Sequence, residues 1–223
     1  MPVRVLAVDT TTPRGSLAVI DGEELLGEVR LLSQAGHSAR LLPAVAFLLE
    51  GLGLRPADLH GFAVALGPGS FTGLRVGIST VQGLALAAGR PSLGLSALDV
   101  LAHRICGSAE LLVPLMDAYR DEVFAATYDT EARQMSPPVA AVLESVLEGL
   151  PAGSLALAGD GAQRYRDRIR VRRPDALFPG RSLFLASTLA RLAEPRLAAG
   201  EGGGPEALRP LYLRDAAIRR PAR

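Results

Sequence analysis

Residues 3–21 read VRVLAVDTTTPRGSLAVID, and residues 111–129 repeat the same order of features as LLVPLMDAYRDEVFAATYD. Each stretch predicts a strand that stops at an aspartate, Asp9 or Asp117, followed by a turn and a second strand. Further helices and strands are predicted after both copies. A repeated strand–aspartate–hairpin unit of this kind indicates a duplicated α/β fold with two subdomains.

We expect the first subdomain to span residues 1–108 and the second to span residues 109–223. We expect the tail, 205–223, to pack back on the first half. Apolar spacing predicts helices at 37–52, 70–88, 139–149 and 183–199, and strands at 24–32, 61–66 and 154–159.

The composition indicates a soluble, cytoplasmic protein. Of the 223 residues, 48% are apolar and 21% are charged, a balance typical of chains that form a core. The single cysteine, Cys106, excludes an internal disulfide framework and favours a reducing compartment. The longest apolar candidate, 76–89, is too short to span a bilayer. The net charge of +1 argues against binding nucleic acid over the whole surface and leaves a local basic patch open.

Two segments have the residues of a phosphate site. The turn Asp9-Thr10-Thr11 offers a carboxylate for hydrated Mg²⁺ and donors for phosphate oxygens, although the same residues equally satisfy the backbone of their own turn. The loop GPGSFTGLRVG, residues 67–77, lacks the lysine of a Walker loop, yet a helix that follows a glycine-rich turn still attracts anions.

The glycines of this loop favour a packing role over phosphate binding. Gly73 and Gly77 fall inside the predicted helix 70–88, where each costs about 0.5–1 kcal/mol relative to alanine. A close helix contact would compensate for that cost. Helices 37–52 and 70–88 are both apolar nearly all round, and a helix without a polar face is usually buried on both sides.

Metal and protease chemistry find little support. The histidines His37, His60 and His103 do not form the H-E-x-x-H pattern of a zinc site, and no G-x-S-x-G elbow is present. We expect each histidine to be a surface or capping residue, and we predict no catalytic and no metal-binding residue.

The stretch RYRDRIRVRR, residues 164–173, is the densest basic segment. Its arginines could line a phosphate backbone, with Arg168, Arg170 and Arg172 as the candidate contacts. The alternation of these arginines with apolar residues also fits a solvated face whose charges pair with nearby acids.

The chain resembles the TsaB (YeaZ) family over nearly its whole length. This family supplies a bacterial subunit of the machinery that installs threonylcarbamoyladenosine beside the tRNA anticodon; it was once labelled glycoprotease-like and is a shortened paralogue of the catalytic subunit TsaD. The resemblance implies the actin-like (ASKHA) fold of two ribonuclease-H-like subdomains. It rests on AVDTTTPRGSLAV, HSARLLPAV, LGPGSFTGLRVGISTVQGLA, MDAYRDEVFAATY, AGDGAQRY and LYLRDA.

The resemblance also implies that the catalytic apparatus of TsaD is missing. Ala97 and Leu101 stand where TsaD-like proteins carry two metal-binding histidines. The second aspartate turn, 117–120, reads DAYR where actin-like nucleotide sites need glycine, and AGDGAQ at 158–163 keeps only a trace of the adenosine-binding glycines. We expect a pseudoenzyme with no cofactor in the isolated chain, and place any nucleotide at the interface with TsaD. The remnant phosphate turn would be Asp9, Thr10 and Thr11.

The implied function is a non-catalytic scaffold that binds TsaD, works with the ATPase TsaE, reaches tRNA through the complex and forms a homodimer when alone. The alternatives are a free-standing ATPase or small-molecule kinase of the actin-like fold and, after these, a protease. The helices 37–52 and 70–88 are implied to pack on the equivalent pair of TsaD, through Leu41, Val45, Leu48, Gly73, Val76, Gly77, Thr80 and Leu84.

Overall fold

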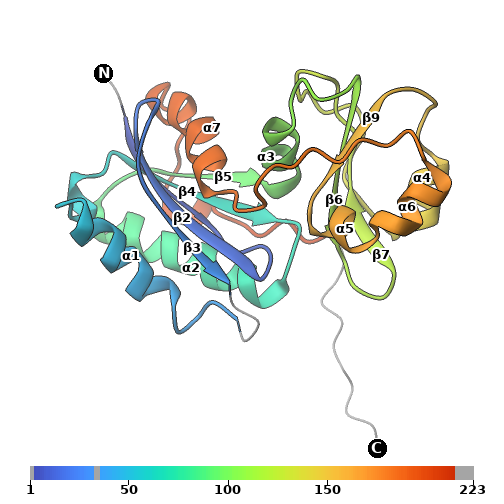
Figure 1. Cartoon of the computed structure of the whole chain (residues 1–223). Helices are drawn as coiled ribbons and strands as arrows, with labels where there is room; N and C mark the ends of the chain where they lie inside the picture. Colours follow the sequence, from blue (N-terminus) through green and yellow to red (C-terminus); the bar gives the residue numbers. More distant parts are fainter. Residues whose placement is uncertain (1–2, 33–35, 214–223) are drawn as a thin grey trace, which may run out of the picture.

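Two β-sheets, each covered by helices, form the protein (Figure 1). The computed structural model describes residues 3–32 and 36–213. The first sheet has the strand order β3-β2-β1-β4-β5. Its β1–β3 are antiparallel, and β4 and β5 continue from β1 in parallel. These strands are β1 (Arg4–Asp9), β2 (Arg14–Asp21), β3 (Glu24–Leu32), β4 (Gly61–Gly67) and β5 (Ser92–Ser96).

The second sheet repeats four strands of the first. Its order is β8-β7-β6-β9, in which β6 and β7 are antiparallel and β9 is parallel to β6. Since β6 takes the place of β1, Asp117 ends its strand as Asp9 does. The predicted duplication is confirmed. The strands are β6 (Leu111–Asp117), β7 (Glu122–Ala125), β8 (Val139–Val142) and β9 (Leu155–Ala158).

Helices cover both faces of the first sheet. β1 alternates between two cores: Leu6 and Val8 pack toward α1 and α2, whereas Val5 and Ala7 pack toward α3 and α7. The second of these cores continues into the other sheet through Leu112, so the subdomains share apolar packing. The covering helices are α1 (Leu41–Gly51), α2 (Phe71–Ala88), α3 (Ala97–Arg104) and α7 (Ala186–Ala198).

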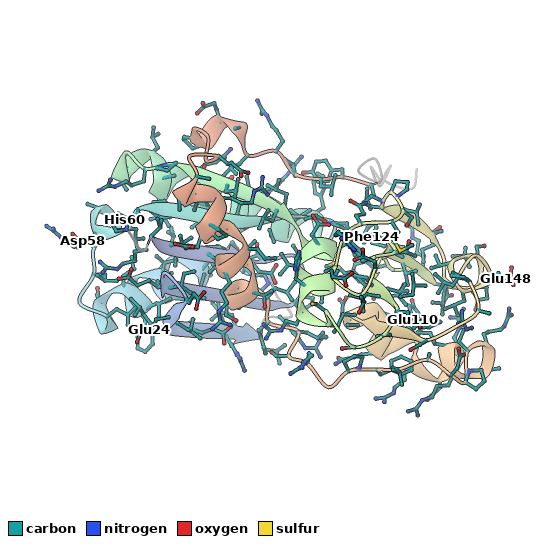
Figure 2. All side chains as sticks on the ribbon, turned by 90° about the horizontal axis from the view of Figure 1, so that it is seen from above. Glu24, Asp58, His60, Glu110, Phe124 and Glu148 are labelled. Atoms are coloured by element: carbon teal, nitrogen blue, oxygen red, sulfur yellow. The ribbon has the colours of Figure 1, made fainter. Side chains whose placement is uncertain are left out.

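The second subdomain has a smaller core of its own, formed with α4 (Leu143–Glu148), α5 (Asp160–Arg164) and α6 (Arg166–Arg172). The helix predicted at 139–149 is wrong in its first turn, because Val139–Val142 pairs with β7 as an edge strand. Seen from above, α7 crosses the strands of the first sheet; Asp58 and His60 mark one end of the molecule and Glu148 the other (Figure 2).

The chain returns to the first subdomain before it ends. α7 supplies Leu189, Ala190 and Ala193 to the core beneath β1, on the face of the sheet that it covers together with α3. The prediction assigned α7 to the second subdomain, 109–223, whereas the helix packs on the first sheet. Gly203 exchanges two backbone hydrogen bonds with Ser92 in β5. Leu208, next to η2 (Pro205–Ala207), joins the core under α2, whereas 214–223 lie outside the described residues.

The glycine-rich loop seats α2 on the turn after β1. Ser70 N donates to Thr11 O over 2.7 Å, and the Thr10 hydroxyl donates to Gly73 O over 2.8 Å. The Ser70 hydroxyl in turn accepts from Gly73 N and caps the helix. A Cβ on Gly73 would collide with the carbonyl oxygen of Thr10, and one on Gly77 with the Thr10 hydroxyl. The expected close packing exists, and it lies inside the chain.

We predict that Gly73→Ala lowers the free energy of unfolding by about 1–3 kcal/mol, because the added methyl group must push α2 off the turn. Urea denaturation of the isolated protein measures this. Gly83→Ala is the matched control, since a Cβ on Gly83 of the same helix meets nothing within 4 Å. The control should be neutral or stabilising by up to about 1 kcal/mol. Equal stability of the two variants would contradict the seating of α2.

Candidate functional site

The first aspartate turn is closed upon itself. Asp9, Thr10 and Thr11 are all buried, and Asp9 Oδ1 accepts hydrogen bonds from both the N–H and the hydroxyl of Thr11. Burial raises the pKa of Asp9 above its ordinary value, an effect that the Thr11 bonds and the charge of His37 oppose. Within the described part of the chain, Asp9 Oδ2 has no hydrogen-bond partner. Thus the predicted phosphate donors already serve the turn and the start of α2.

His37 belongs to this buried group, so its assignment as a surface or capping residue is wrong. Its side chain is packed against the backbone of Gly15, where a Cβ would touch the imidazole ring. His37 Nε2 lies 2.8 Å from Thr12 O, and the carbonyl of His37 accepts from Leu41 N at the start of α1. The ring fits because position 15 is a glycine. A single glycine 22 residues away along the chain is too weak a sequence signal to predict that His37 is buried.

The second aspartate turn is occupied by side chains of its own subdomain. Arg164 Nη1 pairs with Asp117 Oδ2 at 2.9 Å, and the Tyr165 hydroxyl lies 3.3 Å from Asp117 Oδ1. Tyr119, Arg120 and Asp121 all have positive φ, between 56° and 61°. Three successive non-glycine residues in this conformation are rare and cost energy at each position. The bulky side chains that the sequence placed here thus sit on a strained turn.

The remnant adenosine segment packs tightly against the end of β6. A Cβ on Gly159 would collide with Leu115 O, and one on Gly161 would also lie against this strand. Asp160 Oδ1 accepts from the backbone N–H of Asp117 and of Gly161. Burial raises the pKa of Asp160 to about 6, and the negative charge of Asp117 adds to the rise.

These residues do not fit a magnesium nucleotide. In a working site both aspartates must be open to a hydrated cation, and bare backbone must face the phosphates. Here Asp117 is ion-paired with Arg164, and Asp9 is buried beneath its own turn. No other metal site is present in the described part of the chain: residues 3–32 and 36–213 contain no cluster of three or more His, Cys, Asp and Glu side chains that could hold a metal ion.

The helix faces predicted for the partner interface need correction. Leu41, Val45 and Leu48 of α1 are buried against the first sheet, and Gly73 and Gly77 of α2 lie on the Thr10 turn. These five residues are interior because each helix needs one apolar face for its own core. The other three predicted contacts, Val76, Thr80 and Leu84, are half-buried.

The outer faces of the same two helices are also apolar. Phe47 of α1 is 72% exposed and Leu86 of α2 is 73% exposed. Small residues, among them Ser79 and Gly83, separate the larger side chains of α2. An exposed apolar surface with a smooth helix beside it is typical of a protein–protein contact. We call this surface, made of Leu42, Ala46, Phe47, Ser79, Gly83, Leu86 and Ala87, the outer helix face.

The Arg-rich segment forms a solvated face with internal ion pairs. Arg168 contacts Asp121 at 2.8 Å and Glu144 at 2.6 Å, and Arg172 contacts Glu148 at 3.0 Å. These pairs favour the solvated-face alternative over the nucleic-acid contact. The guanidinium of Arg170 lies over the ring of Phe178. As for membranes, the described helices include none that is long and apolar enough to cross one.

We predict that Asp160 makes stability depend on pH. Its pKa is raised in the folded protein, so the native state holds a proton that the unfolded state has lost. Stability contributed by the neutral carboxyl is therefore full below about pH 4 and falls as the pH rises through about 6. Relative to Asp160→Asn, the wild-type protein should lose about 1–3 kcal/mol of unfolding free energy across this range. The free energy of unfolding is measured by urea denaturation at several pH values. If it changed with pH in the same way for the wild type and for Asp160→Asn, the raised pKa of Asp160 would be contradicted.

Comparison with known proteins agrees with this geometry. Residues 29–199 match the family model "TsaD: tRNA N6-adenosine threonylcarbamoyltransferase". The tRNA threonylcarbamoyladenosine biosynthesis protein TsaB of Escherichia coli is 31% identical, over 96% of this chain and 95% of that protein. TsaB of Bacillus subtilis is 33% identical over 56% of this chain and 54% of its own length.

Solved structures show the same relationship. YeaZ from Pseudomonas aeruginosa superposes with a TM-score of 0.81 at 35% identity, covering 95% of this chain and all of that one. Component A of the Acidaminococcus fermentans (R)-2-hydroxyglutaryl-CoA dehydratase has a TM-score of 0.56 at 11% identity, over 88% of this chain and 99% of its own, which indicates a shared fold alone. The expected actin-like fold is confirmed, and the chain belongs to the TsaB (YeaZ) family.

Proposed function

We propose that the protein serves tRNA threonylcarbamoyladenosine biosynthesis as a non-catalytic subunit that binds TsaD through its outer helix face. The observation that carries the proposal is the exposure of Phe47 and Leu86 on the two helices implied to meet TsaD. Their inner faces are fully used by the chain's own core, so the contact must be made by the outer residues. Such a contact removes apolar side chains from water at the centre of an interface.

The closed aspartate turns support a subunit without chemistry of its own. An ATPase or kinase of the actin-like fold needs an open second turn, and here Arg164 and Tyr165 hold Asp117. A protease needs an activated nucleophile, and the sequence has no nucleophile elbow. Action through a partner is therefore preferred to both alternatives.

The wider assembly remains part of the proposal. It includes TsaE, tRNA reached through the complex, a homodimer formed in the absence of TsaD, and a nucleotide at the junction with TsaD. The same outer helix face would serve the homodimer, because an unpartnered apolar surface is also available to a second copy. The cytoplasm is the proposed location.

We predict that Phe47→Glu and Leu86→Glu each weaken the complex with TsaD at least tenfold and lower tRNA modification in parallel. Each places an unpaired charge in the proposed contact while changing only an exposed side chain of the isolated protein. Analytical ultracentrifugation of the mixed subunits measures the complex, and circular dichroism checks the fold. Val171→Glu is the matched control, because Val171 is 82% exposed on α6, away from the outer helix face. Normal binding by both outer-face variants would rule this interface out.

We also predict that isothermal titration of the isolated protein with Mg-ATP gives no binding heat, and that phosphate release stays at background. The physical reason is that Arg164 already neutralises Asp117. Binding that Asp9→Ala abolishes would instead revive the ATPase alternative.

A further inference from the structure

An open hollow of about 480 Å³ lies where α3, the loop 180–182 and α7 meet. The chain crosses from the second subdomain to α7 at this point (Figure 1). Its lining is polar and strongly cationic, and neither aspartate turn belongs to it. The lining residues are His103, Arg104, Gly180, Arg181, Ser182, Thr188 and Arg191.

Arg104 is held in a fixed position at this hollow. Its Nε donates to Ser182 O over 2.9 Å, and its Nη1 donates to the hydroxyl of Thr188. The described residues provide no hydrogen-bond partner for its Nη2. A half-buried guanidinium fixed on one side and free on the other is pre-organised for a planar oxyanion, because little side-chain entropy remains to be lost.

The positive charge around Arg104 is not balanced. Burial lowers the pKa of Arg104; the charge of Glu28 opposes this effect, and the charges of Arg30, Arg191 and Arg181 add to it. Glu28 already forms an ion pair with Arg30, with 2.7 Å between Glu28 Oε2 and Arg30 Nη2. Neither Arg181 nor Arg191 has an ion pair or a hydrogen bond from its side chain within residues 3–32 and 36–213.

This arrangement differs from that of the other arginine-rich surface. On α6, Arg168 and Arg172 each reach a carboxylate. The hollow, by contrast, is lined by three arginines and by no aspartate or glutamate. Like charges held together repel each other, and an anion that enters removes the repulsion and gains charge-assisted hydrogen bonds.

We propose that Arg104, Arg181 and Arg191 form a binding site for phosphate groups. Arg104 is the fixed member, while the exposed Arg181 and Arg191 close on the anion from the loop and from α7. Two sources share this chemistry: the phosphodiester backbone of RNA and a free phosphate compound. The RNA source rests on the proposed function in tRNA modification, whereas the site itself does not.

The test uses the full-length protein and two probes, an anticodon stem-loop RNA and sodium pyrophosphate. The variant is Arg181→Gln/Arg191→Gln, which removes two side chains that have no partner in the described structure and so preserves the fold. The matched control is Arg168→Gln/Arg172→Gln, which makes the same change of charge on α6. Fluorescence anisotropy follows the RNA at several salt concentrations, and calorimetry follows pyrophosphate.

We expect the variant to bind at least one probe about tenfold or more weakly, while the control binds like the wild type. If RNA is the source, the slope of log affinity against log salt should also fall by roughly 0.7–0.9 for each lost contact. Weakening for pyrophosphate alone would support the site with a free phosphate compound as its source. The proposal is overturned if the wild type binds neither probe, if the variant binds both normally, or if the control loses as much affinity. Assembly with TsaD, measured separately, keeps this result distinct from a failure of the proposed function.

Discussion

The close approach of α2 to the turn after β1 is the contact on which the rest of the structure depends. It requires positions 73 and 77 to lack a Cβ, because the backbone and the hydroxyl of Thr10 occupy that space. Asp9, at the start of the same turn, is fully buried, and its carboxylate accepts both hydrogen bonds of Thr11. The close approach also fixes which side of α2 faces the sheet, and so leaves the face with Ser79, Gly83 and Leu86 to the solvent. The glycine-rich loop 67–77, whose sequence is typical of a phosphate-binding loop, therefore serves to pack α2 against the turn after β1.

The aspartate turns of the two halves are closed in two different ways. In the first half the chain's own backbone and threonines satisfy the aspartate, as Thr11 does for Asp9. In the second half, the side chains of Arg164 and Tyr165 donate hydrogen bonds to the carboxylate of Asp117. In both halves of the actin-like fold, the aspartate that ends the first strand is therefore already bonded to side chains or backbone of the chain itself. The exposed apolar faces of α1 and α2 and the arginines at the hollow are the surfaces to which the two proposals assign contacts with other molecules.

The sequence was sufficient for the fold, because hydrophobic periodicity and the repeated aspartate are local signals that survive in one chain. It failed where packing between distant segments decides the outcome. The apolar pattern of α1 and α2 predicted burial, yet it could not say which face meets the sheet, so Leu41, Val45 and Gly77 were assigned to the wrong side. His37 was missed because its environment is made by Gly15 and Thr12. Similarly, α7 lies far along the chain from the strands that it covers, and the arginines at positions 104, 181 and 191 meet only in the folded molecule.

Hydrogen–deuterium exchange of this protein, alone and mixed with TsaD, tests most directly whether it acts through its helices. Exchange reports local opening, which a partner suppresses where it binds. The amides of α1 and α2 should exchange more slowly in the mixture, while those of α6 and of the Tyr119–Asp121 turn keep their rates. Slower exchange confined to that turn or to Gly159–Gly161, with α1 and α2 unchanged, would contradict the proposed interface and point back to the aspartate turns.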